Sequence, residues 1–530
     1  MLQPIRVSES RELLYRWNSY IRQIMFSEDS TKVLQSESPT VLIQPPLWPE
    51  ADTITFPRER KSRSRIFASI RGHEWMTALL FMVCDIVCWI LLYGLVGFTR
   101  RDAFFLSAFE FVLVDCLLLV VIVQALYIVG GYDRNTDMRS LNYTTEHILA
   151  IIGAAALGSL VIYSAAAFDA EMKPSRGVLL VSFIAFLPVS LSYRRFLCKR
   201  IAASTAQRSF LVVGGGELAR RFYQVYKGSP NHQRLEFVTN DESAIGKSIA
   251  DNGSPIIEGG IAAKLTQLDQ RYSGVILAEG IDRLDQELIE RLVRTQFQKT
   301  RVYTLESFYE AQWRHVPLHT IDPVWPLQMG FQLARMSPYH YLKRLCDIVL
   351  SAALLLIFLP LFPVIILSIW LEAGRPAFFR QMRIGREGQR FVAYKFRTMA
   401  NGGGTSDDIY TRKGDSRITR TGRWLRKCRF DELPQLWNVL KGDMSLIGPR
   451  AEWEKCVERY EKKIPFYHFR HLVKPGITGW AQVNYPYGDS EEDAIKKLQY
   501  DLYYIRHYSL RLDTMILLKT IHTMAFGKGR

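Results

Sequence analysis

The sequence predicts an integral membrane protein of several domains: a four-helix transmembrane bundle, a Rossmann-like α/β domain, and a re-entrant membrane helix that leads into a second α/β domain. Three observations carry this prediction. Four long apolar segments follow a polar N-terminal region, a glycine-rich turn follows an apolar strand near mid-chain, and a fifth apolar segment is broken by prolines before a strongly basic region. With 530 residues the chain is too long for a single small binding module.

Composition limits the class of protein further. The chain is 48% hydrophobic and 23% charged, so it is not a disordered protein as a whole. Its seven cysteines include no CxxC pair, which indicates neither a disulfide framework nor a zinc site and fits a reducing compartment. The net charge of +16 is compatible with nucleic acid, anionic lipid or an anionic substrate as partner, and the position of the charge has to decide among them.

The membrane region is predicted from apolar segments of suitable length. Residues 1–71 are polar, contain no signal peptide and are expected to be cytoplasmic, whereas residues 72–200 hold four segments close to the ~17 to 25 residues that cross a bilayer as a helix. These segments run from Trp75 to Phe98, Phe104 to Val129, Ile148 to Phe168 and Gly177 to Tyr193. Basic residues crowd the two outer flanks more than the loops at Arg100 and Lys173, which predicts that both flanks are cytoplasmic.

Three acids, Asp85, Glu110 and Asp115, lie inside these apolar runs. Ionisable groups within a membrane often mark function. The alternative is a pair of acids that face the interior of the bundle and serve its structure.

Residues 201–330 read as a Rossmann-like cytoplasmic domain. An apolar strand from Ser209 to Val213 is followed by Gly214, Gly216 and Ala219, the turn and helix start of a dinucleotide-type fold. Glu236 lies near the position of a ribose-binding acid. A domain that binds no nucleotide and uses its glycines only for tight strand–helix packing remains the alternative.

Residues 338–373 are predicted to enter the membrane and turn back. Proline removes a helical hydrogen bond and clashes with the preceding turn, so Pro360 and Pro363 provide a break within the apolar segment. Between Gly374 and Phe430, fifteen basic residues stand against four acids, a net charge of +11 that strongly opposes translocation.

The basic block adjoins a membrane segment, which favours phosphate chemistry at a bilayer surface over simple attraction to anionic lipid. No nucleic-acid-binding module is visible in the sequence, so nucleic acid is not expected as a partner.

Six ordered stretches of this C-terminal region are sharply patterned. They are Arg383 to Phe391, Tyr394 to Met399, the spacing of Arg417, Thr419, Gly422, Leu425 and Arg426, Asp431 to Asn438, Gly442 to Arg450, and Lys474 to Asn484. From Tyr339 to the C-terminus the chain thereby resembles the bacterial polyprenyl-phosphate sugar-1-phosphate transferases, the monotopic phosphoglycosyl transferases that begin exopolysaccharide, capsule and O-antigen synthesis. It departs from that family's Pro-Arg-Pro-Glu motif at Ala451.

The resemblance implies that residues 374–530 form a phosphoglycosyl transferase catalytic domain at the bacterial inner membrane, with the active site on the cytoplasmic side. The implied reaction transfers a sugar phosphate from a UDP-sugar to undecaprenyl phosphate, releases UMP and requires Mg²⁺. Asp431 matches the family's nucleophile, which forms a covalent aspartyl-phosphosugar, and Glu432 matches its Mg²⁺ ligand. A homodimer is a further family-level expectation.

The residue types agree with this chemistry. A carboxylate can attack phosphorus to form an acyl phosphate, and cations spread the negative charge of the reacting phosphates. Arginine binds phosphate in bidentate fashion, so the candidate contacts for the diphosphate and the lipid phosphate are Lys395, Arg397, Arg417, Arg426 and Arg450.

Several alternatives remain open from the sequence. Asp431 could be the N-cap of the helix that follows it. Trp480 could lie at the bilayer interface or in the protein core, and the amphipathic stretch from Lys497 to Thr523 could lie on the membrane or pack on the catalytic domain. Two rivals to the transferase are a nucleotide-sugar epimerase or dehydratase that would use the glycine turn, and a catalytically inert scaffold of a polysaccharide assembly complex.

Overall fold

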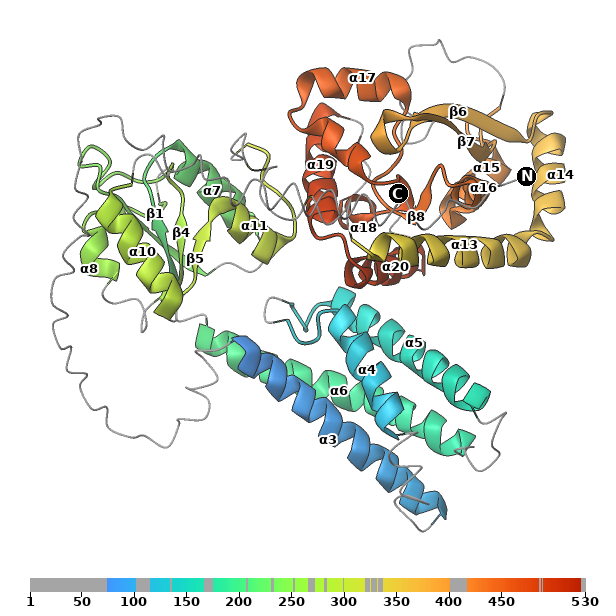
Figure 1. Ribbon diagram of the computed structural model, residues 1–530, viewed down its shortest axis with the longest axis horizontal. Coiled ribbons are helices and arrows are strands. Elements are labelled where there is room, and N and C mark those ends of the chain that lie inside the picture. The colour runs from blue at the N-terminus through green and yellow to red at the C-terminus, as the bar shows by residue number, and fades with distance from the viewer. Residues whose placement is uncertain are drawn as a thin grey trace, which may run out of the picture. The chain divides into compact units, whose positions relative to one another are not determined.

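The structure, a computed structural model, describes most of the chain from residue 74 to residue 525 (Figure 1). The ranges outside the description are 1–73, 102–114, 134–135, 166–174, 206–207, 230–232, 251–252, 266–271, 281–283, 299, 320–324, 326–330, 332–336, 401–416, 486–487, 489 and 526–530. The predicted N-terminal segment 1–71 and Glu110 fall within these ranges.

Three described helices are long and apolar enough to cross a bilayer: α3 (Glu74–Arg101), α5 (Leu141–Ala165) and α6 (Arg176–Thr205). Helix α4 (Cys116–Ile128) is apolar but has only 13 residues, and the chain just before it lies outside the description. The structure therefore contains three of the four predicted spans, and the second span stays a prediction.

The acids of the bundle face its interior. Asp85 on α3 is fully buried and pairs with the buried Arg194 on α6 at 2.5 Å, and Tyr132 donates to it at 2.7 Å. Asp115 accepts from the indole Nε1 of Trp89 at 2.7 Å. Since a buried charge is costly unless it is paired, these contacts support the structural interpretation of both acids.

The middle domain is a five-stranded parallel sheet in the order β3-β2-β1-β4-β5, the order of a Rossmann-like half. Its strands are β1 (Ser209–Val213), β2 (Arg234–Val238), β3 (Ile257–Glu258), β4 (Tyr272–Leu277) and β5 (Val302–Thr304), and its helices are α7 (Glu217–Lys227), α8 (Ile261–Leu265), α10 (Gln286–Gln298) and α11 (Leu305–Trp313).

Gly214 and Glu236 serve the packing of this domain. Gly214 has a φ of +127°, and a Cβ there would lie 2.8 Å from the carbonyl oxygen of Ala278. Glu236 is in the middle of β2, where it accepts from Ser209 Oγ at 3.0 Å and from Tyr272 OH at 2.7 Å. These bonds tie β2 to β1 and β4, which supports the architectural interpretation.

The proline break is present. Helices α13 (Tyr339–Phe358) and α14 (Leu361–Ala373) meet at a 62° bend, with Pro360 in the capping position of α14 and Pro363 in its first turn. Every fourth residue of α13 carries a buried polar side chain, at Lys343, Asp347 and Ser351, whereas the opposite face of the helix is apolar and exposed. The helix therefore packs one polar stripe on the protein and presents the other face for lipid.

After α14 the chain forms an α/β domain, as predicted. It comprises the antiparallel hairpin of β6 (Phe378–Ile384) and β7 (Arg390–Phe396) joined through η6 (Arg386–Gly388), the parallel pair β8 (Ser445–Ile447) and β9 (Gly476–Thr478), and the helices α15 (Arg420–Cys428), η7 (Phe430–Glu432), α16 (Gln435–Lys441), α17 (Glu454–Lys463), η8 (Tyr467–Leu472), α18 (Trp480–Asn484), α19 (Glu491–Arg506) and α20 (Leu510–Ala525).

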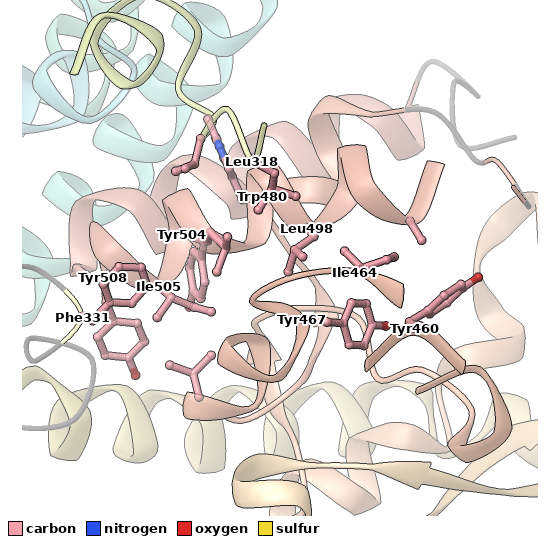
Figure 2. Close-up of a cluster of buried hydrophobic side chains, with 14 of the residues drawn as sticks. Leu318, Phe331, Tyr460, Ile464, Tyr467, Trp480, Leu498, Tyr504, Ile505 and Tyr508 are labelled. Carbon is pink, nitrogen blue, oxygen red and sulfur yellow. The ribbon is translucent and has the colours of Figure 1, made fainter. Parts of the chain in front are cut away.

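The C-terminal helices pack on this domain. Figure 2 shows Leu498, Tyr504 and Ile505 of α19 in one buried apolar cluster with Tyr467 and Trp480. Trp480 is 2% exposed and its Nε1 donates to the carbonyl of Arg314 at 2.9 Å. The core interpretation of Trp480 is therefore confirmed. The C-terminal stretch packs on the domain through buried residues such as Leu512 and Ile516, whereas Leu517 and Ile521 are 41% and 43% exposed, so a contact of that face with the bilayer stays a prediction.

Candidate active site

One cavity of about 1370 Å³ is lined mostly by the C-terminal domain, together with Asn142 and Glu146 of α5. Six of the seven predicted site residues line it: Lys395, Arg397, Arg426, Asp431, Glu432 and Arg450. Arg417 is not among its described lining residues; it lies just before α15, where its backbone carbonyl accepts from Ala400 N at 3.0 Å. The structure thus brings together residues that are up to 55 positions apart in sequence, from Lys395 to Arg450, around one space.

Asp431 is held in a tight turn between two helices. Helix α15 ends at Arg429, whose φ of +60° places it in the left-handed region, and the chain then makes the single 3₁₀ turn η7 that contains Asp431. Helix α16 begins only at Gln435, with Pro434 in the capping position. Asp431 is therefore not the N-cap of that helix. The left-handed conformation of Arg429 costs conformational energy, and such local strain is often found at functional sites.

The two adjacent carboxylates have opposite surroundings. Glu432 is buried, and its Oε1 accepts from Lys395 Nζ at 2.6 Å and from Arg450 Nη2 at 3.2 Å. Burial opposes its ionisation, but the charges of Lys395 and Arg450 prevail and hold the pKa of Glu432 well below its usual range. Glu432 is thus a permanent anion at neutral pH.

Neighbouring cations compensate the negative charge of Asp431 less fully than that of Glu432. Burial, and then the negative charge of Glu432, raise the pKa of Asp431 above its usual value, while Lys395, Arg429 and Arg426 act in the opposite direction. A carboxylate with a raised pKa is a stronger base and nucleophile once it is ionised. Two neighbouring acids are therefore differentiated by environment, as is common at catalytic sites.

Asn438 fixes this arrangement, a role that the sequence interpretation did not assign. Its fully buried side chain donates from Nδ2 to the carbonyl of Val392 at 2.7 Å and accepts the N–H of Tyr394 at 3.2 Å. Both partners lie on β7, next to Lys395. Asn438 therefore locks α16 against β7 and sets Lys395 opposite Glu432.

The spacing of the motif around α15 has a structural reason. Thr419 is the N-cap, its Oγ1 accepting from Gly422 N at 2.9 Å, and a Cβ at Gly422 would lie 2.1 Å from the carbonyl oxygen of Thr398. Leu425 is fully buried, and Arg426 donates from Nε to Thr398 Oγ1 at 2.9 Å. The helix can thus approach the end of β7 closely and place Arg426 at the cavity.

Arg397 has partners that the sequence did not reveal. Its guanidinium donates to the carbonyls of Ala373 at 2.9 Å, Pro376 at 3.3 Å and Met399 at 2.9 Å. It therefore ties the end of α14 to the strand that carries Lys395. A phosphate contact by Arg397 stays a prediction.

A second buried group lines the same cavity and was not predicted. Arg470 donates from Nη2 to Asp501 Oδ2 at 2.9 Å and to the carbonyl of Arg450 at 3.1 Å, so it braces the backbone that carries Arg450. Burial raises the pKa of Asp501 to about 6, although Arg470 opposes the shift. The signal that could have found Asp501 is an acid in the apolar stripe of an amphipathic helix, between Leu498 and Leu502.

Comparisons with known proteins identify relatives of this chain. The family model for bacterial sugar transferases matches residues 338–527. A UDP-N-acetylgalactosamine-undecaprenyl-phosphate N-acetylgalactosaminephosphotransferase of Aeromonas hydrophila is 40% identical over 49% of this chain and 60% of its own length. A UDP-glucose:undecaprenyl-phosphate glucose-1-phosphate transferase of Xanthomonas campestris pv. campestris is 45% identical over 48% of this chain and 53% of its own length.

The chain thus spans between half and two thirds of these two relatives. An uncharacterized sugar transferase of Bacillus subtilis, in contrast, is matched over 89% of its length at 40% identity, which corresponds to 36% of this chain. The range matched by the family model contains the carboxylate pair and its cations. The chain belongs to the bacterial sugar transferase family.

Proposed function

We propose that the protein transfers a sugar-1-phosphate from a UDP-sugar to undecaprenyl phosphate and releases UMP, as the first membrane step of bacterial polysaccharide synthesis. The observation that carries the proposal is the pair Asp431 and Glu432, adjacent in the chain but opposite in pKa shift, in a cavity lined by Lys395, Arg426 and Arg450. The names of the Aeromonas and Xanthomonas relatives give the same acceptor but different sugars, so the sugar is left open.

The reaction would proceed in two displacements. In the first, a carboxylate oxygen of Asp431 attacks the phosphorus that bears the sugar, and the bond from that phosphorus to the bridging oxygen breaks, so that its electron pair leaves with UMP. In the second, a phosphate oxygen of undecaprenyl phosphate attacks the same phosphorus, and the carboxylate of Asp431 departs. Atoms and charges balance over the two steps.

The chain's own cations supply the electrostatic stabilisation. Lys395 and Arg450 both contact Oε1 of Glu432. Arg426, on α15, lines the same cavity. Negative charge that develops on the equatorial phosphate oxygens would lie among these three side chains. Asn438 and Arg470 act indirectly. Asn438 holds the strand that carries Lys395, and Arg470 holds the loop that carries Arg450.

The residues present also fit Mg²⁺. Lys395 and Arg450 both bind Oε1 of Glu432, so Oε2 of Glu432 and the carboxylate of Asp431 are the oxygens that would hold the ion. Within the described residues no cluster of three or more His, Cys, Asp or Glu side chains could hold a metal, but Mg²⁺ usually takes one or two carboxylates together with substrate phosphates. When bound, the ion would neutralise phosphate charge.

The proposed topology places the active site on the cytoplasmic side of the inner membrane. The 62° bend at Pro360 and the +11 charge of residues 374–430 favour a helix pair that enters the bilayer and returns over one that crosses it. Cysteine accessibility should then find residue 250 and Lys519 on the same, cytoplasmic side. Labelling of Lys519→Cys from the periplasm would contradict the re-entrant interpretation.

The proposal is tested by UMP release from a panel of UDP-sugars by the purified full-length protein with undecaprenyl phosphate. We expect release with at least one UDP-sugar and a loss of release in Asp431→Asn, with Lys462→Gln on the exposed face of α17 as a matched control. No release with any donor from a folded protein would favour the inert scaffold.

A further inference from the structure

A second, small cavity of about 20 Å³ lies at the first turns of α13 and shares no lining residue with the large cavity. Five segments that are distant in sequence meet there: α13, η6, the start of β8, residues 472–474 before β9, and Tyr508 between α19 and α20. The lining of the small cavity includes the ionisable side chains of His340, Lys343, Arg344, Asp347, Arg386 and Lys474. We call them the α13 basic cluster. Arg386 and Lys474 belong to two patterned stretches that the proposed reaction does not use.

Two of the cations in the cluster already have strong partners. Lys343 forms an ion pair with Asp513, and Arg344 donates to the carbonyls of Val439 at 2.6 Å and Leu440 at 2.8 Å, at the C-terminal end of α16. The acid of the cluster is also engaged, since Asp347 Oδ1 accepts from Ser445 Oγ at 3.1 Å and from Leu446 N at 3.0 Å.

The remaining charges leave the cluster positive. Arg386 is paired at 3.2 Å with Glu387, whose side chain is 59% exposed, so this pairing is screened by water. Lys474 forms no ion pair with another residue of the described chain. Burial, and then the charge of Arg344, lower the pKa of Lys474; Arg386 acts in the same direction, whereas Asp347 and Asp443 oppose the shift.

The cluster lies at the N-terminal end of α13, whose outer face is apolar and exposed. On the opposite face of the same first turns, Tyr341 is 81% exposed, Leu342 46% and Leu345 59%. Large apolar side chains with this exposure continue along α13 to Leu359, as expected of a face in lipid. The polar start of such a helix belongs at the headgroups, where basic pockets attract anionic lipid.

The size of the small cavity excludes larger ligands. A volume of this order holds one group of about the size of a water molecule. A phosphoryl oxygen is such a group, whereas a nucleotide or a sugar is far larger. The chemistry and the size together indicate a phosphate group of which one oxygen enters the cavity while the rest stays at the surface.

We propose that the α13 basic cluster binds the phosphate of an anionic phospholipid headgroup, held by Arg386 and Lys474 beside Arg344. The bound headgroup neutralises the cluster and anchors the N-terminal end of α13 at the membrane surface. This inference uses none of the residues assigned to the transfer reaction, so its test is independent of that reaction.

The test uses the full-length protein in nanodiscs and a fluorescent phosphatidylglycerol or phosphatidylcholine probe. We expect the wild-type protein to prefer phosphatidylglycerol, and Lys474→Gln and Arg386→Gln each to lower that preference roughly fivefold, the effect of about one basic residue near an anionic surface. Lys462→Gln, which removes an exposed charge on α17, should leave the preference unchanged. Thermal unfolding in neutral lipid verifies that each variant is folded.

Three results would overturn the proposal. The first is an equal preference for phosphatidylglycerol in wild type, Lys474→Gln and Arg386→Gln. The second is binding of millimolar inorganic phosphate to the cluster in neutral lipid together with no preference for phosphatidylglycerol, because the cluster would then be a site for free anions. The third is displacement of the phosphatidylglycerol probe by an equimolar amount of undecaprenyl phosphate, which would assign the cluster to the acceptor.

Discussion

The ammonium of Lys395 lies 2.6 Å from Oε1 of Glu432, and both side chains are largely buried, at 16% and 7% exposure. Arg450 approaches the same oxygen at 3.2 Å. Because removing one partner of a buried pair leaves an uncompensated charge, each of these residues also determines the state of the other. The pair thereby separates the roles of two neighbouring acids: Glu432 is held ionised by its partners, whereas Asp431 remains reactive.

Lys395 predicts an alkaline limit to activity. Burial, with Arg450 and Arg383, lowers the pKa of Lys395 to about 8 in spite of Glu432. As pH rises through about 8 the ammonium loses its proton, so Glu432 and the donor phosphate lose a cation and kcat/KM should fall. The pH–rate profile measures this limit, and Lys395→Arg should shift it upward. A limit at the same pH in Lys395→Arg would show that another group titrates.

The same residue predicts the opposite trend in stability. The folded-state pKa of about 8 lies below the usual value of 10.5, so between these two pH values the unfolded chain binds more protons at this position than the folded chain. The contribution of Lys395 to the free energy of unfolding should therefore increase with pH across this window. Comparing thermal unfolding of wild type and Lys395→Met from pH 8 to pH 10 checks the sign; a difference that is independent of pH would contradict it.

Asn438 should matter for both stability and rate. Asn438→Ala leaves the carbonyl of Val392 and the N–H of Tyr394 without their side-chain partner, at a cost of about 1 to 3 kcal/mol for each buried group. We expect a lower Tm and, because β7 is released from α16, a lower kcat. Lys441→Ala, on the exposed side of α16, is the control. Unchanged unfolding in Asn438→Ala would contradict the proposed lock.

Arg397 can be tested for its two roles separately. Arg397→Lys keeps the charge but cannot reach several carbonyls at once, so we expect a loss of about 1.5 to 3 kcal/mol in stability, the usual contribution of a hydrogen bond to a charged group. Chemical denaturation measures the loss. If stability is retained while the donor KM rises, the guanidinium acts on phosphate instead.

The glycines of the middle domain provide a matched pair. Gly214→Ala forces a Cβ into contact with the backbone of Ala278 at a positive φ, so it should destabilise the protein by at least ~1 kcal/mol. At Gly216 a Cβ would meet nothing within 4 Å, and Gly216→Ala should be tolerated. Thermal unfolding measures the stability of both variants. A folded Gly214→Ala with normal Tm and altered donor KM would show that the domain takes part in donor binding.

The sequence was sufficient to predict features whose residue pattern lies within one continuous segment. Three of the apolar spans, the break at Pro360, the strand–turn–helix at Gly214 and the turn that carries Asp431 and Glu432 are local patterns, and the structure contains the corresponding elements. The proposed roles of the site residues stay predictions. Arg417 is not among the described lining residues of the cavity, so its phosphate contact stays a prediction.

The parts that sequence could not provide depend on contacts between distant segments. The pairing of Lys395 with Glu432 joins residues 37 positions apart, and that of Arg470 with Asp501 joins residues 31 positions apart. Trp480 looks alike in sequence whether it lies in a core or at a membrane interface, and only the packing of α19 against it decides. Such cases require the tertiary fold.

Trapping of the covalent intermediate tests the central proposal most directly. Wild-type protein incubated with labelled UDP-sugar and no acceptor should carry a phosphosugar on the peptide that contains Asp431, detectable by intact-mass and peptide mass spectrometry. Asp431→Asn should carry none and should lose turnover by a factor on the order of 10⁴ or more. Glu432→Gln should form the adduct slowly. An adduct that still accumulates in Asp431→Asn, or near-normal turnover of that variant, would contradict Asp431 as the nucleophile.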